Sequence, residues 1–104
     1  MPVREAVVVL ITAPPALAPT LARSLVEARL AACVAITPIR SIYRWEGAIQ
    51  DDEEQQLVLK TSRDRVDAIQ AHVREHHSYE VPEVLVLPVL EGSPAYLKLI
   101  ADQT

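Results

Sequence analysis

Two short runs of residues, one near each end of the chain, contain no polar position at all. Residues 6–11 read Ala-Val-Val-Val-Leu-Ile, and residues 84–87 read Val-Leu-Val-Leu. Runs of this length that are rich in β-branched residues favour strands buried on both faces over helices. We expect these two strands to lie side by side and parallel in one sheet.

Apolar residues that recur every three or four positions predict two amphipathic helices and a shorter third one. The expected ranges are about 16–32, about 64–77 and 94–101. Pro19 fits the first helix only in its first turn, where a missing N–H group would have had no partner anyway.

The segment 33–61 predicts a single long β-hairpin. Its arms are rich in β-branched and aromatic residues, and residues 46–48, Glu-Gly-Ala, supply the turn. Each arm could extend over about ten residues or more, whereas strands usually have roughly five or six. Pro38 must then lie at a bend or at a sheet edge. Such a hairpin overhangs a small domain, so its tip needs another surface to pack on.

The resulting element order is β-α-β-β-α-β followed by a short helix, which is the split βαβ or ferredoxin-like arrangement. We expect one α+β domain, residues 1–104, with an antiparallel sheet and two helices on one face. Because the first and last strands are apolar on both faces, the uncovered sheet face should be buried by other subunits.

Composition narrows the classes of partner and the compartment. The 104 residues carry a net charge of −4, which argues against a nucleic-acid partner because phosphate binding needs a basic surface. Cys33 is the only cysteine, so no disulfide forms within one chain, and this fits a reducing compartment. The run 6–11 is too short to span a membrane and its surroundings do not resemble a signal peptide. We therefore expect a cytoplasmic protein without a membrane partner.

Four segments together resemble the CutA family, the divalent-cation tolerance proteins. They are Cys-Val-Ala-Ile at 33–36, Ser-Ile-Tyr-Arg-Trp-Glu-Gly at 41–47, Leu-Lys-Thr at 59–61 and Tyr-Glu-Val-Pro-Glu at 79–83. The similarity extends from about residue 7 to residue 99. It implies a ferredoxin-like fold, a tight homotrimer whose long hairpins extend sheets across subunit boundaries, and a likeness to the PII signalling proteins.

The resemblance implies a protein that binds or senses divalent metal ions, with Cu(II) or another divalent metal as its ligand, and no enzyme. The alternative is a PII-like signal-transducing trimer that binds a small anion or nucleotide in clefts between subunits. An enzyme acting in the same clefts is a third hypothesis, although no motif in the chain specifies a reaction.

The resemblance makes His76 and His77 the candidate metal ligands, and imidazole suits copper, zinc and nickel. Neighbouring residues on a helix point about 100° apart, so the alternative is two helix-terminal histidines that interact with the helix dipole. His72 lies one turn before His76 and could contribute a second imidazole. Two positions depart from the family: Ser78 replaces a proline, and Ile11 replaces a cysteine found in some metal-binding members.

A second group of side chains is expected at an intersubunit cleft or interface. Tyr43 and Trp45 share one face of a hairpin arm, and we favour packing between subunits over a stacking platform for a ligand. The acidic run 51–54 is interpreted as a solvated hairpin segment that discourages edge pairing. The other expected members, which would form a buried Lys–Glu pair or a ligand cleft, are Lys60, Tyr79, Glu80 and Glu83.

Overall fold

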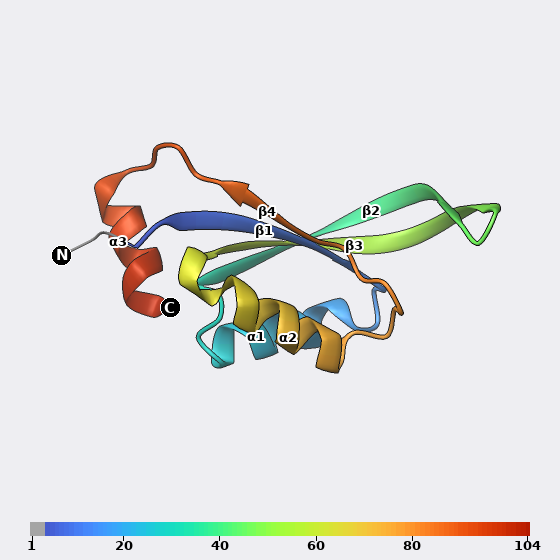
Figure 1. Cartoon of the computed structure of the whole chain (residues 1–104), viewed down its shortest axis with the longest axis horizontal. Helices are drawn as coiled ribbons and strands as arrows, with labels where there is room; N and C mark the ends of the chain where they lie inside the picture. The colour runs from blue at the N-terminus through green and yellow to red at the C-terminus, as the bar shows by residue number, and fades with distance from the viewer. Residues whose placement is uncertain (1–3) are drawn as a thin grey trace.

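The computed structural model describes residues 4–104, and its elements follow the expected order (Figure 1). No helix within these residues is long and apolar enough to cross a membrane. Helices α1 and α2 lie on one face of the sheet, while α3 lies at the end away from the hairpin tip. The strands are β1 (Ala6–Ala13), β2 (Cys33–Trp45), β3 (Ala48–Ser62) and β4 (Val84–Pro88); the helices are α1 (Ala18–Glu27), α2 (Val66–His76) and α3 (Pro94–Gln103), with a 3-10 turn η1 (Arg63–Arg65) before α2.

The sheet has the strand order β2-β3-β1-β4, and every neighbouring pair is antiparallel. The first and last strands are neighbours, as expected, but the expectation that they run parallel is wrong. Each strand–helix–strand unit returns the chain to its original direction, so β1 matches β2 and β3 matches β4. Because β2 and β3 form a hairpin and run opposite to each other, β4 must run opposite to β1.

The first helix is shorter than the apolar pattern suggested. It begins at Ala18, which places Pro19 in the first turn, and it ends at Glu27 and not near residue 32. Arg29 adopts the left-handed conformation with φ of 58°, and the Leu30 N–H donates to the Leu25 carbonyl. This hydrogen bond closes the helix in the manner of a Schellman cap. The chain can therefore turn back toward the sheet and start β2.

The hydrophobic core lies between the sheet and the two helices. Alternate residues of β1 and β3 point into it, and one stripe of each helix faces them. Burial of each large aliphatic side chain contributes about 1.5–3 kcal/mol before the entropy cost of ordering is subtracted. The largest fully buried aliphatic side chains are Val7, Val9, Ile11, Leu21, Leu25, Leu57, Leu59, Ile69 and Val73.

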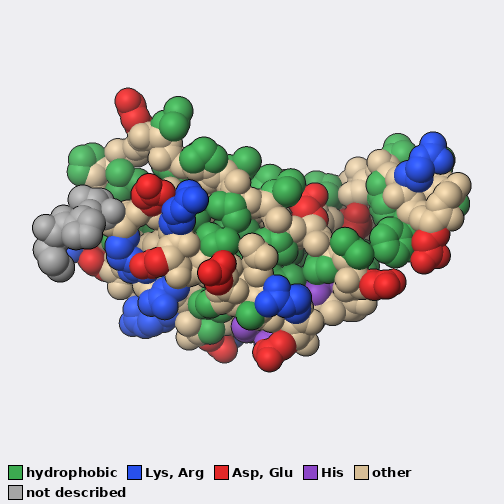
Figure 2. Space-filling view, in the orientation of Figure 1, with side chains coloured by type: hydrophobic (Ala, Val, Ile, Leu, Met, Phe, Trp, Pro, Cys, Tyr) green, Lys and Arg blue, Asp and Glu red, His purple; other side chains and the backbone are tan. Residues whose placement is uncertain are grey.

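The opposite sheet face is apolar too, although no helix of the described chain covers it. Leu10 in β1 pairs with Val58 on one side and with Leu85 on the other. Leu85 and Leu87 in β4 are 53% and 44% exposed. Figure 2 shows hydrophobic side chains along the concave upper side of the molecule, over β4. A single copy of the chain leaves this surface in water.

The hairpin extends well beyond the rest of the sheet. β2 and β3 pair continuously from Cys33–Lys60 to Trp45–Ala48, but β1 pairs with β3 only between Gln55 and Ser62. The outer part of the hairpin therefore has no third strand, and the molecule is 50 Å long and 25 by 21 Å across. Pro38 lies within β2, on the edge strand of the sheet. Glu46 and Gly47 form the tip with φ values of 49° and 79°, as in a type I′ turn.

Candidate functional site

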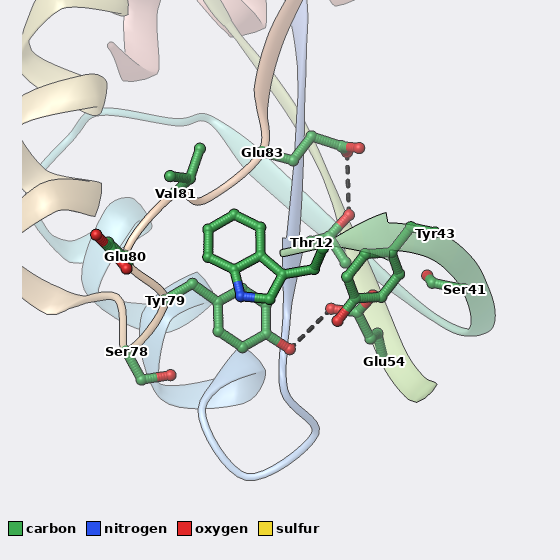
Figure 3. Close-up of a pocket in the computed structure, with 10 residues that line it drawn as sticks. Thr12, Ser41, Tyr43, Glu54, Ser78, Tyr79, Glu80, Val81 and Glu83 are labelled. Atoms are coloured by element: carbon green, nitrogen blue, oxygen red, sulfur yellow. Dashed lines mark hydrogen bonds between the residues drawn. The ribbon is translucent and has the colours of Figure 1, made fainter. Parts of the chain in front are cut away.

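A cleft of about 460 Å³ opens where β1 ends and the loop between α2 and β4 crosses the base of the hairpin (Figure 3). Strand β1 contributes Thr12 at its end. Ser41, Tyr43 and Trp45 alternate along one face of β2. Glu54 of β3 lies on the same face, because its pairing partner Ile39 belongs to the same alternating set. The lining residues are Thr12, Ser41, Tyr43, Trp45, Glu54, Ser78, Tyr79, Glu80, Val81 and Glu83.

Two hydrogen bonds fasten the loop to the sheet across this cleft. The Tyr79 hydroxyl donates to Glu54 Oε2 at 2.8 Å, and the Thr12 hydroxyl donates to Glu83 Oε2 at 3.0 Å (Figure 3). Each bond joins a loop residue to a strand residue far away in the chain. These two hydrogen bonds hold the loop wall and the sheet wall of the cleft together.

The lining is acidic and aromatic. It includes three glutamates and no lysine, arginine or histidine among the described residues. Burial and the hydrogen bond to Glu54 raise the pKa of Tyr79 well above its usual range. The hydrogen bond from Tyr43 to the Asp52 carboxylate, with burial, raises the pKa of Tyr43 to about 12. Both phenols stay protonated at neutral pH and act as hydrogen-bond donors to carboxylates.

The structure brings five of the expected cleft residues together and leaves one out. Tyr43, Trp45, Tyr79, Glu80 and Glu83 all line the cleft. Lys60 does not, because it pairs with Val8 near the other end of β1, about 20 Å along β3 from the cleft at 3.3–3.4 Å per residue. The described residues therefore contain no Lys60–Glu pair of the kind that the sequence suggested.

Sequence reasoning missed Glu54, which lies in the acidic run interpreted as solvated. Glu54 is only 5% exposed, whereas its neighbour Glu53 points to the other side of the strand and is exposed. The signal that could have found it is the two-residue period of a strand, which places Glu54 on the same face as Asp52. Asp51, on the opposite face, forms an ion pair with Arg40 that lowers its pKa.

His77 lies just beyond α2 and has both ring nitrogens engaged. Nε2 lies 2.7 Å from the Thr12 carbonyl oxygen, and Nδ1 lies 3.0 Å from the Tyr79 backbone nitrogen. A carbonyl can only accept and a backbone N–H can only donate, so the Nε2-protonated neutral tautomer satisfies both bonds. In this arrangement His77 has no lone pair left for a metal ion and instead anchors the loop to β1.

His76 points away from His77 and contacts His72 instead. The rings of His72 and His76 stack with centroids 4.1 Å apart, and His76 Nδ1 donates to the His72 carbonyl at 2.7 Å. His76 Nε2 keeps its lone pair and has no partner within residues 4–104. His72 Nε2 lies 2.8 Å from the Ser24 hydroxyl, whose own proton is donated to the Leu21 carbonyl. His72 therefore donates from Nε2, and its neutral form carries the lone pair on Nδ1.

Across the described residues, no group of three or more histidine, cysteine, aspartate or glutamate side chains is arranged to hold a metal ion. Ile11, where the family resemblance suggested that a cysteine ligand is missing, is fully buried in the core. One chain therefore provides at most an incomplete ligand set, and the missing ligands would have to come from water or another subunit.

The sheet order, the two helices on one face and the overlong hairpin define a ferredoxin-like α+β domain of the type found in PII-like proteins. The model of the CutA1 divalent ion tolerance protein family matches residues 7–103. The chain belongs to this family.

Relatives and solved structures agree with this assignment. The divalent-cation tolerance protein CutA of Pectobacterium atrosepticum is 46% identical over 98 residues, which is 92% of this chain and 89% of the relative. The crystal structure of CutA1 from Oryza sativa is 40% identical and superposes with a TM-score of 0.94 over 98% of this chain and 95% of that one. A PII-like protein CutA from Nostoc in apo form is 31% identical, with a TM-score of 0.91 over 94% and 96% of the two chains.

Some curated relatives are much longer. The chain spans 47% of the chloroplastic CutA of Arabidopsis thaliana, at 45% identity over 81% of this chain. It spans 55% of the CutA homolog of Xenopus laevis, at 48% identity over 79% of this chain. The matched region is therefore about half of those proteins.

We expect His77→Ala to destabilise the protein and His76→Ala to leave its stability nearly unchanged. The first change removes a partner from the Thr12 carbonyl and from the Tyr79 N–H, and each half-buried group left unpaired costs about 1–3 kcal/mol. The second removes an exposed ring. Urea unfolding at equal protein concentration measures the difference, and equal losses in the two variants would contradict the anchoring role of His77.

Stability should also fall as the pH drops through the range in which His72 titrates. Burial and the neighbouring His76 lower the pKa of His72, with partial opposition from Glu75. The unfolded chain therefore takes up a proton near the ordinary value of about 6.5 while the folded chain does not. The His72 contribution is present above about pH 6.5 and is lost as the pH falls toward the lower folded value. Melting temperatures at pH 7.5 and 5.5 should differ less in His72→Gln than in the wild type.

Proposed function

We propose that this protein works as a cytoplasmic homotrimer in the tolerance of divalent cations, and that it binds or senses the metal ion itself. Family membership carries the general role, because the relatives are named for tolerance of divalent cations. The observation that supports direct metal contact is the exposed imidazole of His76, stacked on His72 with its Nε2 lone pair free.

The trimer is supported by two features of the single chain. The sheet face that lacks a helix layer is lined by Leu10, Leu85 and Leu87, and a surface of this kind needs a partner to leave water. The outer part of the hairpin has strand edges without neighbours and exposed apolar side chains at Ile42 and Ile49. Copies of the same chain can cover both surfaces at once when they assemble with closed symmetry.

The expected metal pair His76 and His77 divides into two roles in this proposal. His76 supplies the first ligand through Nε2, and His72 supplies a second imidazole through Nδ1 after a ring rotation. His77 holds the loop that follows α2. Cu(II) is the favoured ion, because imidazole binds it more tightly than the other first-row divalent ions. Two imidazoles with water should give modest affinity.

The alternative of a PII-like trimer that binds a small anion or nucleotide has less support from the cleft chemistry. A phosphate group needs basic side chains or free backbone N–H groups. The described lining holds three glutamates and no lysine, arginine or histidine. The family name describes a tolerance and specifies no reaction. Three expectations therefore stay predictions: that the protein is no enzyme, that it binds no nucleic acid, and that it resides in the cytoplasm. On the compartment, one relative is named chloroplastic and one solved relative is named periplasmic.

Sedimentation equilibrium at micromolar concentration should give three times the chain mass of 11.5 kDa. Leu85→Asp, on the open sheet face, should shift the protein toward monomers because it places a charge in the proposed interface. Val26→Asp is the matched control, since Val26 is 42% exposed on helix α1. A folded monomer in the wild type, or equal dissociation in both variants, would contradict the proposed assembly.

Calorimetric titration with Cu(II) tests the metal site. We expect His76→Ala to weaken binding about tenfold or more, and His77→Ala to weaken it much less once the folded fraction is accounted for. Binding of the wild type should weaken as the pH drops below about 6.5, because protons compete for the same nitrogen lone pair. Unchanged affinity in His76→Ala at both pH values would rule out this site.

A further inference from the structure

The acidic cleft has an aromatic wall that the proposed metal site does not use. Tyr43, Trp45 and Tyr79 contribute rings to a cavity of about 460 Å³. The volume is in the range of cavities that take small organic ligands, about 300–1,000 Å³. Aromatic faces carry negative electrostatic potential and attract cations, with indole the strongest of the three ring types.

Glu54 gives this wall a buried negative charge. It is 5% exposed, and its Oε2 accepts the Tyr79 hydroxyl. The carboxylate has no ion pair within residues 4–104. A positive charge beside a mostly buried carboxylate is attracted more strongly than one in open water. A cation in the cleft would therefore meet a negative charge that has no counter-ion among the described residues.

The arrangement of the carboxylates discriminates between kinds of cation. Glu54 comes from β3, Glu80 from the loop and Glu83 from the approach to β4, and Glu83 is already engaged by Thr12. They do not converge, since no group of three possible ligands in the described residues could hold a metal ion. A hard divalent ion needs converging oxygens at about 2.0–2.6 Å, whereas an organic ammonium needs only a diffuse negative potential and ring faces.

We propose that this cleft binds a small organic cation, an amine or quaternary ammonium whose charge lies against the rings of Tyr43 and Tyr79 and near the Glu54 carboxylate. Trp45 lines the cleft on the side of the hairpin tip, and Glu80 and Glu83 add negative potential at the rim. The site is separate from the His72–His76 pair and does not depend on metal binding there. Failure of the copper titration and failure of this proposal are therefore distinguishable.

The chain carries its own reporter, because Trp45 is its only tryptophan. The test is titration of Trp45 fluorescence in the full-length protein with tetramethylammonium chloride at constant ionic strength, adjusted with sodium chloride. We expect a saturable change in emission with tetramethylammonium and none with tert-butanol, a neutral molecule of similar size. Calorimetry with the same probe gives an independent dissociation constant.

Adjacent glutamates on opposite faces of β3 provide a matched pair of variants. Glu54→Gln removes the charge but keeps an oxygen that can accept from Tyr79, and we expect it to raise the dissociation constant about fivefold to tenfold. Glu53→Gln removes the same charge from the exposed face and should leave the constant within about twofold. Tyr43→Leu, which removes one ring and keeps the reporter, should also weaken binding. Sedimentation of each variant verifies that assembly is unchanged.

Four results would overturn the proposal. One is the absence of a saturable response in either fluorescence or calorimetry. Another is an equal response to tert-butanol, which would make the cleft a merely apolar site. The third is displacement of tetramethylammonium by Mg²⁺ at equal or lower concentration, which would make it a site for inorganic cations. The fourth is an equal effect of Glu53→Gln and Glu54→Gln, which would show that binding depends only on the net charge of the protein and not on Glu54.

Discussion

The architecture depends on the unequal pairing of β3 with its two neighbours. β3 pairs with β2 along 13 registered positions but with β1 along only eight, because β1 stops at Ala13 opposite Gln55. Beyond that point the sheet narrows to a two-stranded ribbon, and isolated ribbons are marginal in water. The cleft forms at this step in sheet width. The loop after α2 crosses there on its way to β4, and it finds the end of β1 on one side and the base of the hairpin on the other.

The same step in sheet width leaves two apolar surfaces of the single chain uncovered. A layer of helices covers only the face that carries Val9, Ile11, Leu57 and Leu59. The other face places aliphatic side chains of β1 and β4 in water, and the ribbon adds unpaired strand edges. Surfaces of both kinds drive association. In the proposed trimer, assembly would add burial to the core of a small domain, and the hairpin length would set how far one copy reaches along another.

Hydrophobic pattern was sufficient to predict the element order, the fold class and the hairpin, since each depends on local periodicity and turn chemistry. The pattern did not predict the relative direction of neighbouring strands or the contacts between residues far apart in the chain. The parallel pairing of β1 and β4 was wrong because apolarity on both faces is compatible with either direction. The sequence analysis placed Lys60 at one cleft with Glu80 and Glu83, whereas the strand register places Lys60 opposite Val8, away from the cleft. Glu54 was hidden in a run of acids, and only its hydrogen bond to Tyr79, 25 residues away, distinguishes it from Glu53.

The two adjacent histidines at the end of α2 have different structural roles. Helix α2 ends at His76, and His77 adopts an extended backbone with φ of −88° and ψ of 142°. This change of conformation directs His76 back along the helix toward His72 and His77 toward Thr12 at the end of β1. Because Thr12 also donates to Glu83, the His77 contact and the Glu83 contact both hold the loop against the same residue. The loop geometry, and with it the position of Tyr79 beside Glu54, therefore rests on a neutral His77. One helix end therefore directs His76 to the imidazole pair and uses His77 to position the wall of the cleft, through separate contacts.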